Sequence, residues 1–255
     1  MAREQHESGG LRRSWRVVTL GWCVWLLVTW GLSLMKTSVV PASRWMVVIA
    51  AVGAMAVWPA FRLSQARGGR GGEADGGGAG GGGEAMPRLA RPRLGWRMVL
   101  GDWLTITVLT QMMLWPLWLS SAKFGMTGGN GLLIYQTRWS VGQTAWVGAA
   151  LAGWTLLTAA VVAWGLGRGT RRAGLIAMTL CLLLLLGEPL AYAVAGAAWG
   201  DEVHWPAFRV SPLSTLWGLT VAKADFQAGP WVGRIASAGV AAVVAWLGLG
   251  WMGRR

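Results

Sequence analysis

Glu188 is the residue of this 255-residue chain whose surroundings most suggest chemistry, because it lies inside a long apolar segment. A charged side chain at the centre of a membrane helix is unfavourable by about 2.5 to 3.5 kcal/mol, so it normally faces other helices or a wet cavity. Pro189 follows it, removes a backbone hydrogen bond and leaves a carbonyl free for a cation or water. With Tyr192 one turn later, Glu188 predicts either a proton, cation or substrate contact at a broken helix, or a protonated carboxyl bonded to a neighbouring helix.

Asp102 and Gln111 are the other polar residues expected inside apolar segments. Asp102 lies near the cytoplasmic end of its segment, where a helix N-terminus favours negative charge and Arg93 or Arg97 can pair with it. This position favours a structural role over a functional one. Gln111 lies deeper in the same segment and is expected to form an interhelical hydrogen bond.

The cysteines and histidines predict no catalytic or metal site. Cys23 and Cys181 both fall in apolar segments, so they are expected to be packing residues without a disulfide or a zinc site. His6 and His204 are expected on opposite sides of the membrane, which excludes paired-histidine haem ligation. The sequence has no Gly-x-Ser-x-Gly, His-Glu-x-x-His or Gly-x4-Gly-Lys-Ser/Thr pattern. We therefore expect a protein that is not an enzyme and needs no cofactor.

The composition places these residues in a membrane protein. Hydrophobic residues make up 54% of the chain and charged residues 13%, against about 25% charged in ordinary soluble domains. The apolar residues occur in blocks long enough to cross a bilayer as helices, and they lack the alternation of barrel strands. The predicted fold is an all-α integral membrane protein, a six-helix transmembrane bundle. Its expected spans are 17–35, 45–61, 98–119, 141–166, 173–198 and 231–252.

The basic residues predict how this bundle is oriented. With six spans and both termini cytoplasmic, most of the 23 Lys and Arg residues fall on the cytoplasmic side, as the positive-inside rule requires. The expected location is therefore a bacterial-type inner (plasma) membrane, crossed several times. The first span is longer than the core of a signal peptide and is expected to remain as an anchor. The net charge of +13 is explained by the lipid bilayer as partner and needs no nucleic acid.

The predicted spans divide the chain into six segments. The loop at 62–97 is expected to be flexible around its glycines, and the external loop contains His204, Trp205 and Trp217 as candidate contact residues. Pro212 can start a short amphipathic helix in that loop with Ser211 as its cap. The segments are a basic interfacial lead-in (1–16), helices one and two (17–61), a cytoplasmic Gly/Arg-rich loop (62–97), helices three to five (98–198), an external amphipathic loop (199–230), and helix six with a cytoplasmic tail (231–255).

Tryptophans and small residues predict how the helices meet the membrane and each other. Most of the 20 Trp residues, including Trp22, Trp58 and Trp139, lie near span ends and are expected to anchor the protein at the headgroups. Small residues at four-residue spacing predict close helix packing in spans four and six. These residues are Ala145, Ala149 and Gly153 in span four, and Ala238 with Ala242 and Ala241 with Ala245 in span six.

The layout resembles the membrane permease subunits of exporter-type ABC transporters. The matching pieces are an interfacial stretch at 11–16 before span one and the Ser211-Pro212 stretch with Leu216 and Trp217 between spans five and six. The resemblance implies a separate ATPase subunit, a homodimer and a substrate path between the two copies. The Gly-rich segment 68–83 departs from the pattern. Such permeases engage their ATPase between spans two and three, where this chain is expected to have a flexible insertion.

Two other functions fit parts of the sequence. A scaffold or assembly subunit of a larger membrane complex suits the many Trp anchors and the few polar residues within the spans. Haem or quinone handling would rest on His204 and its neighbouring tryptophans, but the Trp-Gly-x-x-Trp-x-Trp-Asp signature of haem-handling proteins is missing.

Overall fold

A computed structural model describes residues 16–31, 42–71, 92–123, 139–199, 211–220 and 229–252 of the chain, and these ranges contain helices and no strand. Five of the helices are long and apolar enough to cross a membrane. The protein is therefore all-helical, as predicted. A further apolar helix, Arg16–Gly31, is shorter than the span predicted there. The count of six spans and the cytoplasmic termini remain predictions.

The described helices follow the predicted spans with two extensions. The first part of the second span, α2 (Ala42–Val52), continues through a π-helical turn, η1 (Gly53–Val57), into α3 (Trp58–Gly71). The predicted loop 62–97 therefore begins inside a helix, and it also ends inside α4, which starts at Pro92. The remaining helices are α4 (Pro92–Lys123), α5 (Val141–Arg168), α6 (Arg171–Trp199), α7 (Pro212–Leu219) and α8 (Gly229–Met252).

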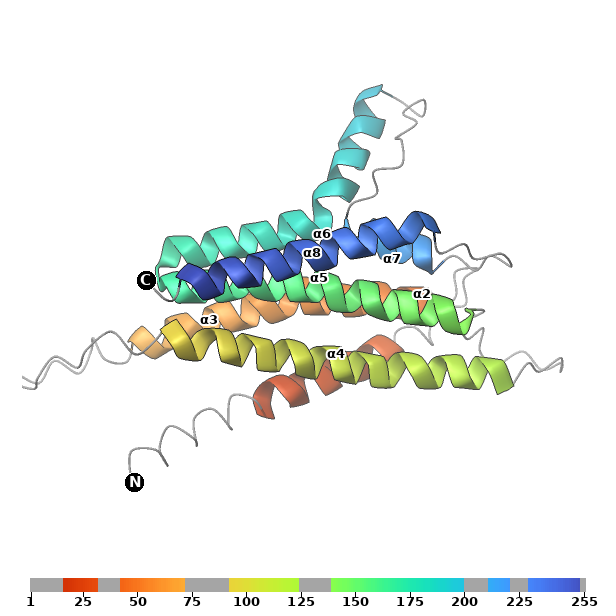
Figure 1. Cartoon of the computed structure of the whole chain (residues 1–255), viewed down its shortest axis with the longest axis horizontal. Helices are drawn as coiled ribbons and strands as arrows, with labels where there is room; N and C mark the ends of the chain where they lie inside the picture. Colours follow the sequence, from red (N-terminus) through yellow and green to blue (C-terminus); the bar gives the residue numbers. More distant parts are fainter. Residues whose placement is uncertain are drawn as a thin grey trace, which may run out of the picture.

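Helix α5 is at the centre of the bundle and packs against α3, α4, α6, α7 and α8 (Figure 1). The long helices lie side by side, and the N-terminal end of α6 lies beside the C-terminal end of α5 because the turn between them is short. Gly169 makes this turn with φ of 62°, a conformation that glycine adopts without steric cost. Its N–H donates to the carbonyl of Leu166, which caps α5.

Helix α6 leaves the bundle at its internal proline. The part after Pro189 turns away from the other helices, and its side chains Leu190, Tyr192 and Val194 are exposed (Figure 1). Helix α7 then lies back inside the bundle, against α2, α5 and α6. Ser211 caps α7 by accepting a hydrogen bond from the N–H of Ser214, so the predicted start of this helix is confirmed.

Close packing is present, but it uses partly different residues from those predicted. Gly153 of α5 lies 3.8 Å from the backbone of Gly239 in α8, measured from an ideal Cβ, and Ala238 and Ala242 are buried. Ala145 and Ala149 are exposed, so their assignment to a helix contact was wrong. The physical reason is that α5 turns other small residues toward its neighbours, Gly148 toward α4 and Gly165 toward α6.

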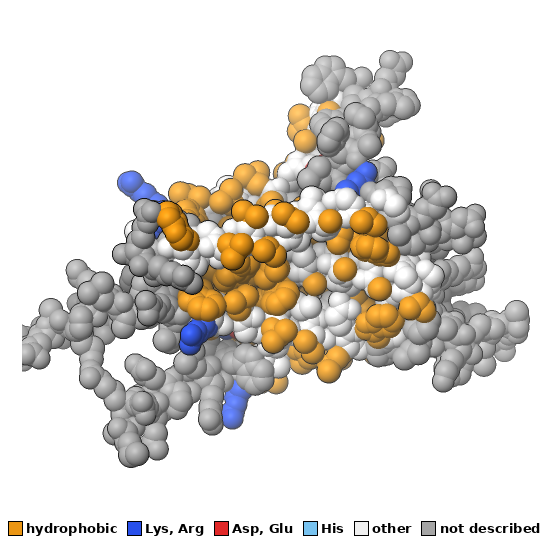
Figure 2. Space-filling model, in the orientation of Figure 1, with side chains coloured by type: hydrophobic (Ala, Val, Ile, Leu, Met, Phe, Trp, Pro, Cys, Tyr) orange, Lys and Arg blue, Asp and Glu red, His pale blue; other side chains and the backbone are white. Residues whose placement is uncertain are grey.

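Exposed apolar side chains are spread along the length of the face that Figure 2 shows, a pattern expected for lipid contact. Exposed Trp30, Trp96 and Trp251 fit the predicted role of membrane anchors. Trp22, Trp58 and Trp139 do not, because each is at most 6% exposed and belongs to the core. Their position near span ends indicated an anchor, whereas the helical face on which they lie turns them inward.

Trp25 attaches the helix Arg16–Gly31 to the second span. Its indole nitrogen donates to the carbonyl of Ile49 at 3.2 Å, and its ring lies where a side chain at Gly53 would be. Gly53 is the first residue of the π-helical turn, so Trp25 packs against the second span at the point where its helix becomes irregular. The absence of a side chain at Gly53 is what lets the two helices meet.

Replacing Gly53 by alanine should therefore destabilise the protein. The added methyl would lie 2.1 Å from Trp25 Nε1, and such overpacking costs about 1 to 3 kcal/mol. Thermal unfolding in detergent measures the effect. Gly101→Ala is the matched control, since nothing lies within 4 Å of its new methyl. Equal midpoints for the two variants would contradict this account of the contact.

Candidate functional site

Glu188 is bonded to α7. Its Oε2 accepts a hydrogen bond from the backbone N–H of Ser211 at 2.5 Å and lies 2.9 Å from the hydroxyl of Ser214. Pro189 comes directly after Glu188, so the carboxylate lies where α6 leaves the bundle and where α7 begins. Of the two predicted roles, this geometry matches the carboxyl bonded to a neighbouring helix, and the protonation predicted with that role stays a prediction.

The carboxylate lies at the N-terminus of α7, where the orphan backbone N–H groups and the helix dipole favour negative charge. Both of its partners donate, so the ionised form can accept both bonds without a proton of its own. Glu188 therefore joins α6, at the residue before Pro189, to the start of α7. Tyr192 does not take part, because it lies in the exposed portion of α6 and is 60% exposed.

The other end of α7 is also held by side chains. Gln143 is 1% exposed and its Nε2 donates to the carbonyl of Leu219 at 2.5 Å, while Trp139 donates to the carbonyl of Thr220 at 3.3 Å. These are carbonyls that the end of a short helix leaves without an internal partner. Side chains at the start of α5 therefore fix where α7 ends.

Arg44 completes this attachment from the second span. Its Nε donates to Thr220 Oγ1 at 3.2 Å, and its guanidinium lies 4.2 Å from the ring of Trp217. Trp45 contacts the same ring edge to face, with centroids 6.3 Å apart. Trp217, predicted as an external contact residue, thus packs within the protein, although it is 39% exposed. His204 and Trp205 lie outside the described residues.

Asp102 forms a buried ion pair with Arg62. Arg62 Nε and Nη2 donate to the two carboxylate oxygens at 2.5 and 2.6 Å, and both side chains are 1% exposed. The indole of Trp58 donates to the same carboxylate at 3.2 Å. This two-pronged geometry is the strong form of an arginine–carboxylate contact. It joins α3 to α4 on either side of the stretch 72–91.

The expected partner of Asp102 was therefore wrong. Arg97 lies over the ring of Trp96 at 5.4 Å, and the side chain of Arg93 is outside the described residues. Asp102 lies ten residues after Pro92, where α4 begins, so it is too far along the helix to act at its N-terminus. The structural role predicted for Asp102 agrees with the ion pair.

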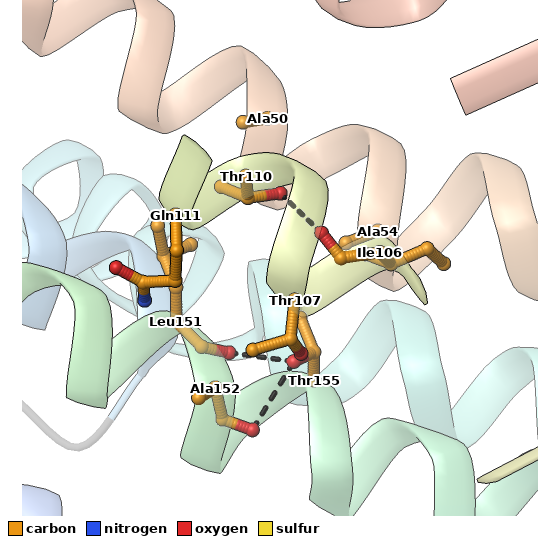
Figure 3. A pocket seen from close by; sticks show the side chains of 9 residues that line it. All are labelled: Ala50, Ala54, Ile106, Thr107, Thr110, Gln111, Leu151, Ala152 and Thr155. Carbon is orange, nitrogen blue, oxygen red and sulfur yellow. Dashed lines mark hydrogen bonds between the residues drawn. The ribbon is translucent and has the colours of Figure 1, made fainter. Parts of the chain in front are cut away.

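Gln111 and three threonines line a small, mostly apolar cavity between α2, η1, α4 and α5 (Figure 3). The volume open to the centre of a water molecule is about 10 Å³ in this cavity, so the cavity has room for one water. The hydroxyl of Thr107 is buried without a hydrogen-bond partner among the described residues. The amide of Gln111 lies against Gly148 of α5, so it packs closely on the neighbouring helix. The lining residues are Ala50, Ala54, Ile106, Thr107, Thr110, Gln111, Leu151, Ala152 and Thr155.

Sequence reasoning missed Arg62, Gln143 and Arg44. Arg62 was assigned to a loop because hydropathy falls at that point, although its spacing of four from Trp58 places both on one helical face. Gln143 follows Ser140 in the spacing of a helix-capping box, and Ser140 does accept the N–H of Gln143. That pattern marked the helix start but not the bond to α7.

The described residues contain no group of three or more His, Cys, Asp or Glu that could hold a metal ion. Cys23 and Cys181 are free thiols. Neither a model of a known protein family, nor a curated protein, nor a solved structure matches this chain. Function must therefore be inferred from the geometry itself.

Removing the carboxylate of Glu188 should loosen α7. Glu188→Ala leaves the N–H of Ser211 without its partner, a loss of about 1 to 3 kcal/mol, whereas the hydroxyl of Ser214 keeps its bonds to Ser211. A lowered thermal unfolding midpoint in detergent is expected. Tyr192→Phe, which removes an exposed hydroxyl four residues along the same helix, should leave the midpoint unchanged. A similar midpoint for both variants would argue against the bond to α7.

The ion pair gives a second expectation. Arg62→Met or Asp102→Leu alone leaves one buried charge unpaired, a loss of about 3 to 5 kcal/mol. The double variant removes both charges and should recover much of that loss. A double-mutant cycle of unfolding free energies measures the coupling. Additive effects of the two substitutions would show that the pair does not hold α3 to α4.

Proposed function

We propose that this chain is a permease-like subunit of an ABC-type transporter, working as a homodimer with a separate ATPase subunit. The observation that carries the proposal is the bend of α6 at Pro189, where Glu188 binds the start of α7 and α7 packs in the bundle. Acidic residues within membrane helices often mark the substrate and ion pathways of transport proteins. A short capped helix between the last two long helices also matches the resemblance in layout.

The tight interior supports a substrate path between two copies. The cavity beside Gln111 holds about one water, so it is too small for a solute to cross through the described part of one chain. The long helices α6 and α8 carry exposed apolar faces, which lipid or a second copy can cover. A dimer would place the pathway between such faces.

The ion pair supports a route for mechanical coupling. Arg62 and Asp102 join α3 and α4, the helices that flank 72–91. A partner that pushes on this stretch would therefore move both helices together. Since the sequence has no nucleotide-binding loop, ATP hydrolysis is assigned to the separate subunit.

The proposal includes six spans, with the helix Arg16–Gly31 as the described part of the first. Both termini are then cytoplasmic, in a bacterial-type inner membrane. Exposed arginines at one end of the bundle support this orientation, since Arg97, Arg168, Arg171 and Arg172 lie at the end where α4 starts and α5 ends.

A scaffold subunit is the second candidate function. The packed interior and the bonded state of Glu188 and Asp102 favour it, because a scaffold needs rigid helices and no pathway. The two candidates differ in the partner that they require. Only the permease requires an ATPase.

Purification of the tagged chain from its native membranes in mild detergent should yield an ATP-hydrolysing subunit in constant ratio. Arg88→Ala with Arg91→Ala, in the stretch that would contact this subunit, should reduce its recovery. Arg254→Ala with Arg255→Ala is the control on the same predicted side. Recovery of a stable complex without any ATPase would favour the scaffold and contradict the permease.

A further inference from the structure

Three arginines gather at the turn between α5 and α6. Arg168 is the last residue of α5, and Arg171 and Arg172 are the first two of α6. All three side chains are exposed. We name this group the arginine corner.

The arginine corner is held rigidly by its backbone. Gly169 closes α5 with its N–H on the carbonyl of Leu166, and Thr170 caps α6 by accepting the N–H of Ala173 at 3.1 Å. Ala173 and Gly174 are buried, which fixes the first turn of α6 against the bundle. The three arginines therefore belong to two fixed helix ends, and only Gly169 and Thr170 separate these ends along the chain.

The arginine corner has no carboxylate partner in the described part of the chain. The acids there are Asp102, which Arg62 binds, and Glu188, which binds α7. Helix α6 has no acidic residue in its first turn, although a helix start disfavours the two cations that are present. Three adjacent positive charges thus repel one another without compensation from the described protein.

The surroundings match an amphiphile with a negative head. Leu175 and Ile176, one turn into α6, are about half exposed, so apolar surface continues directly from the arginines. Arg168 lies over the ring of Trp164 at 5.7 Å, and tryptophan settles at the headgroup level of a bilayer. The charged groups lie toward the ends of the bundle and the apolar side chains between them (Figure 2).

We propose that the arginine corner binds the phosphate headgroup of an anionic phospholipid, whose acyl chains lie along Leu175 and Ile176 of α6. Arginine suits this partner because its planar fork pairs with two phosphate oxygens at once. The lipid phosphate supplies a negative charge next to the start of α6 and the three arginines, where the described protein has no acidic side chain. This site is independent of the transport proposal and requires only that α5 and α6 lie in a membrane.

Thermal unfolding of the purified full chain in mixed micelles tests the site. Phosphatidylglycerol should raise the unfolding midpoint at lower concentration than phosphatidylcholine. Arg171→Gln should weaken the apparent affinity for phosphatidylglycerol by about fivefold, the factor for one interfacial charge. Replacing all three arginines by Gln should abolish the preference. Arg234→Gln is the matched control, because it removes an arginine that lies over Trp231 at another helix end.

Equal effects of both lipids on the parent protein would overturn the proposal. So would an unchanged lipid preference in the triple variant or, if that variant does not fold, in Arg171→Gln. Stabilisation by inorganic phosphate to the same extent would show an adventitious anion site instead of a lipid site. An equal loss of preference in Arg234→Gln would show that binding follows overall charge and not this corner.

Discussion

Hydrocarbon offers no hydrogen-bond partner, and this constraint organises the structure. A charge or a helix end inside the bilayer must be satisfied by the protein itself. The two acids of the described chain obey this rule in different ways, since Asp102 is neutralised by Arg62 and Glu188 fills the N-terminus of α7. The position of α7 depends on the same requirement, because its last carbonyls are reached by Gln143 and Trp139 of the α5 start.

The polar contacts gather at the two ends of the bundle. At one end Arg62 and Asp102 fasten α3 to α4, and the arginine corner joins α5 to α6. At the other, Glu188 and Arg44 hold α7 in place from α6 and from the second span. The first end is where we propose that an ATPase subunit and an anionic lipid bind. The second contains the bend of α6 at Pro189, on which the transport proposal rests.

Local patterns were sufficient to predict the helices but not their contacts. Hydropathy located five membrane-length helices, and the Ser211-Pro212 pair located α7, because spans and caps are encoded over short stretches. The partner of Asp102 lies 40 residues earlier, and one sequence holds no signal that selects Arg62 over Arg97. The inward orientation of Trp22 and Trp58 and the bond from Glu188 to Ser211 also depend on tertiary placement.

The central claim is that α4, α5 and α6 cross a membrane as successive helices. Three crossings place Gly76, before α4, and His204, after α6, on opposite sides. The measurement is labelling of Gly76→Cys and His204→Cys in intact cells with a membrane-impermeant maleimide, in a chain whose Cys23 and Cys181 are replaced by alanine. The account predicts labelling of the cysteine at 204 alone until the cells are permeabilised. Labelling of both before permeabilisation, or of neither, would contradict it.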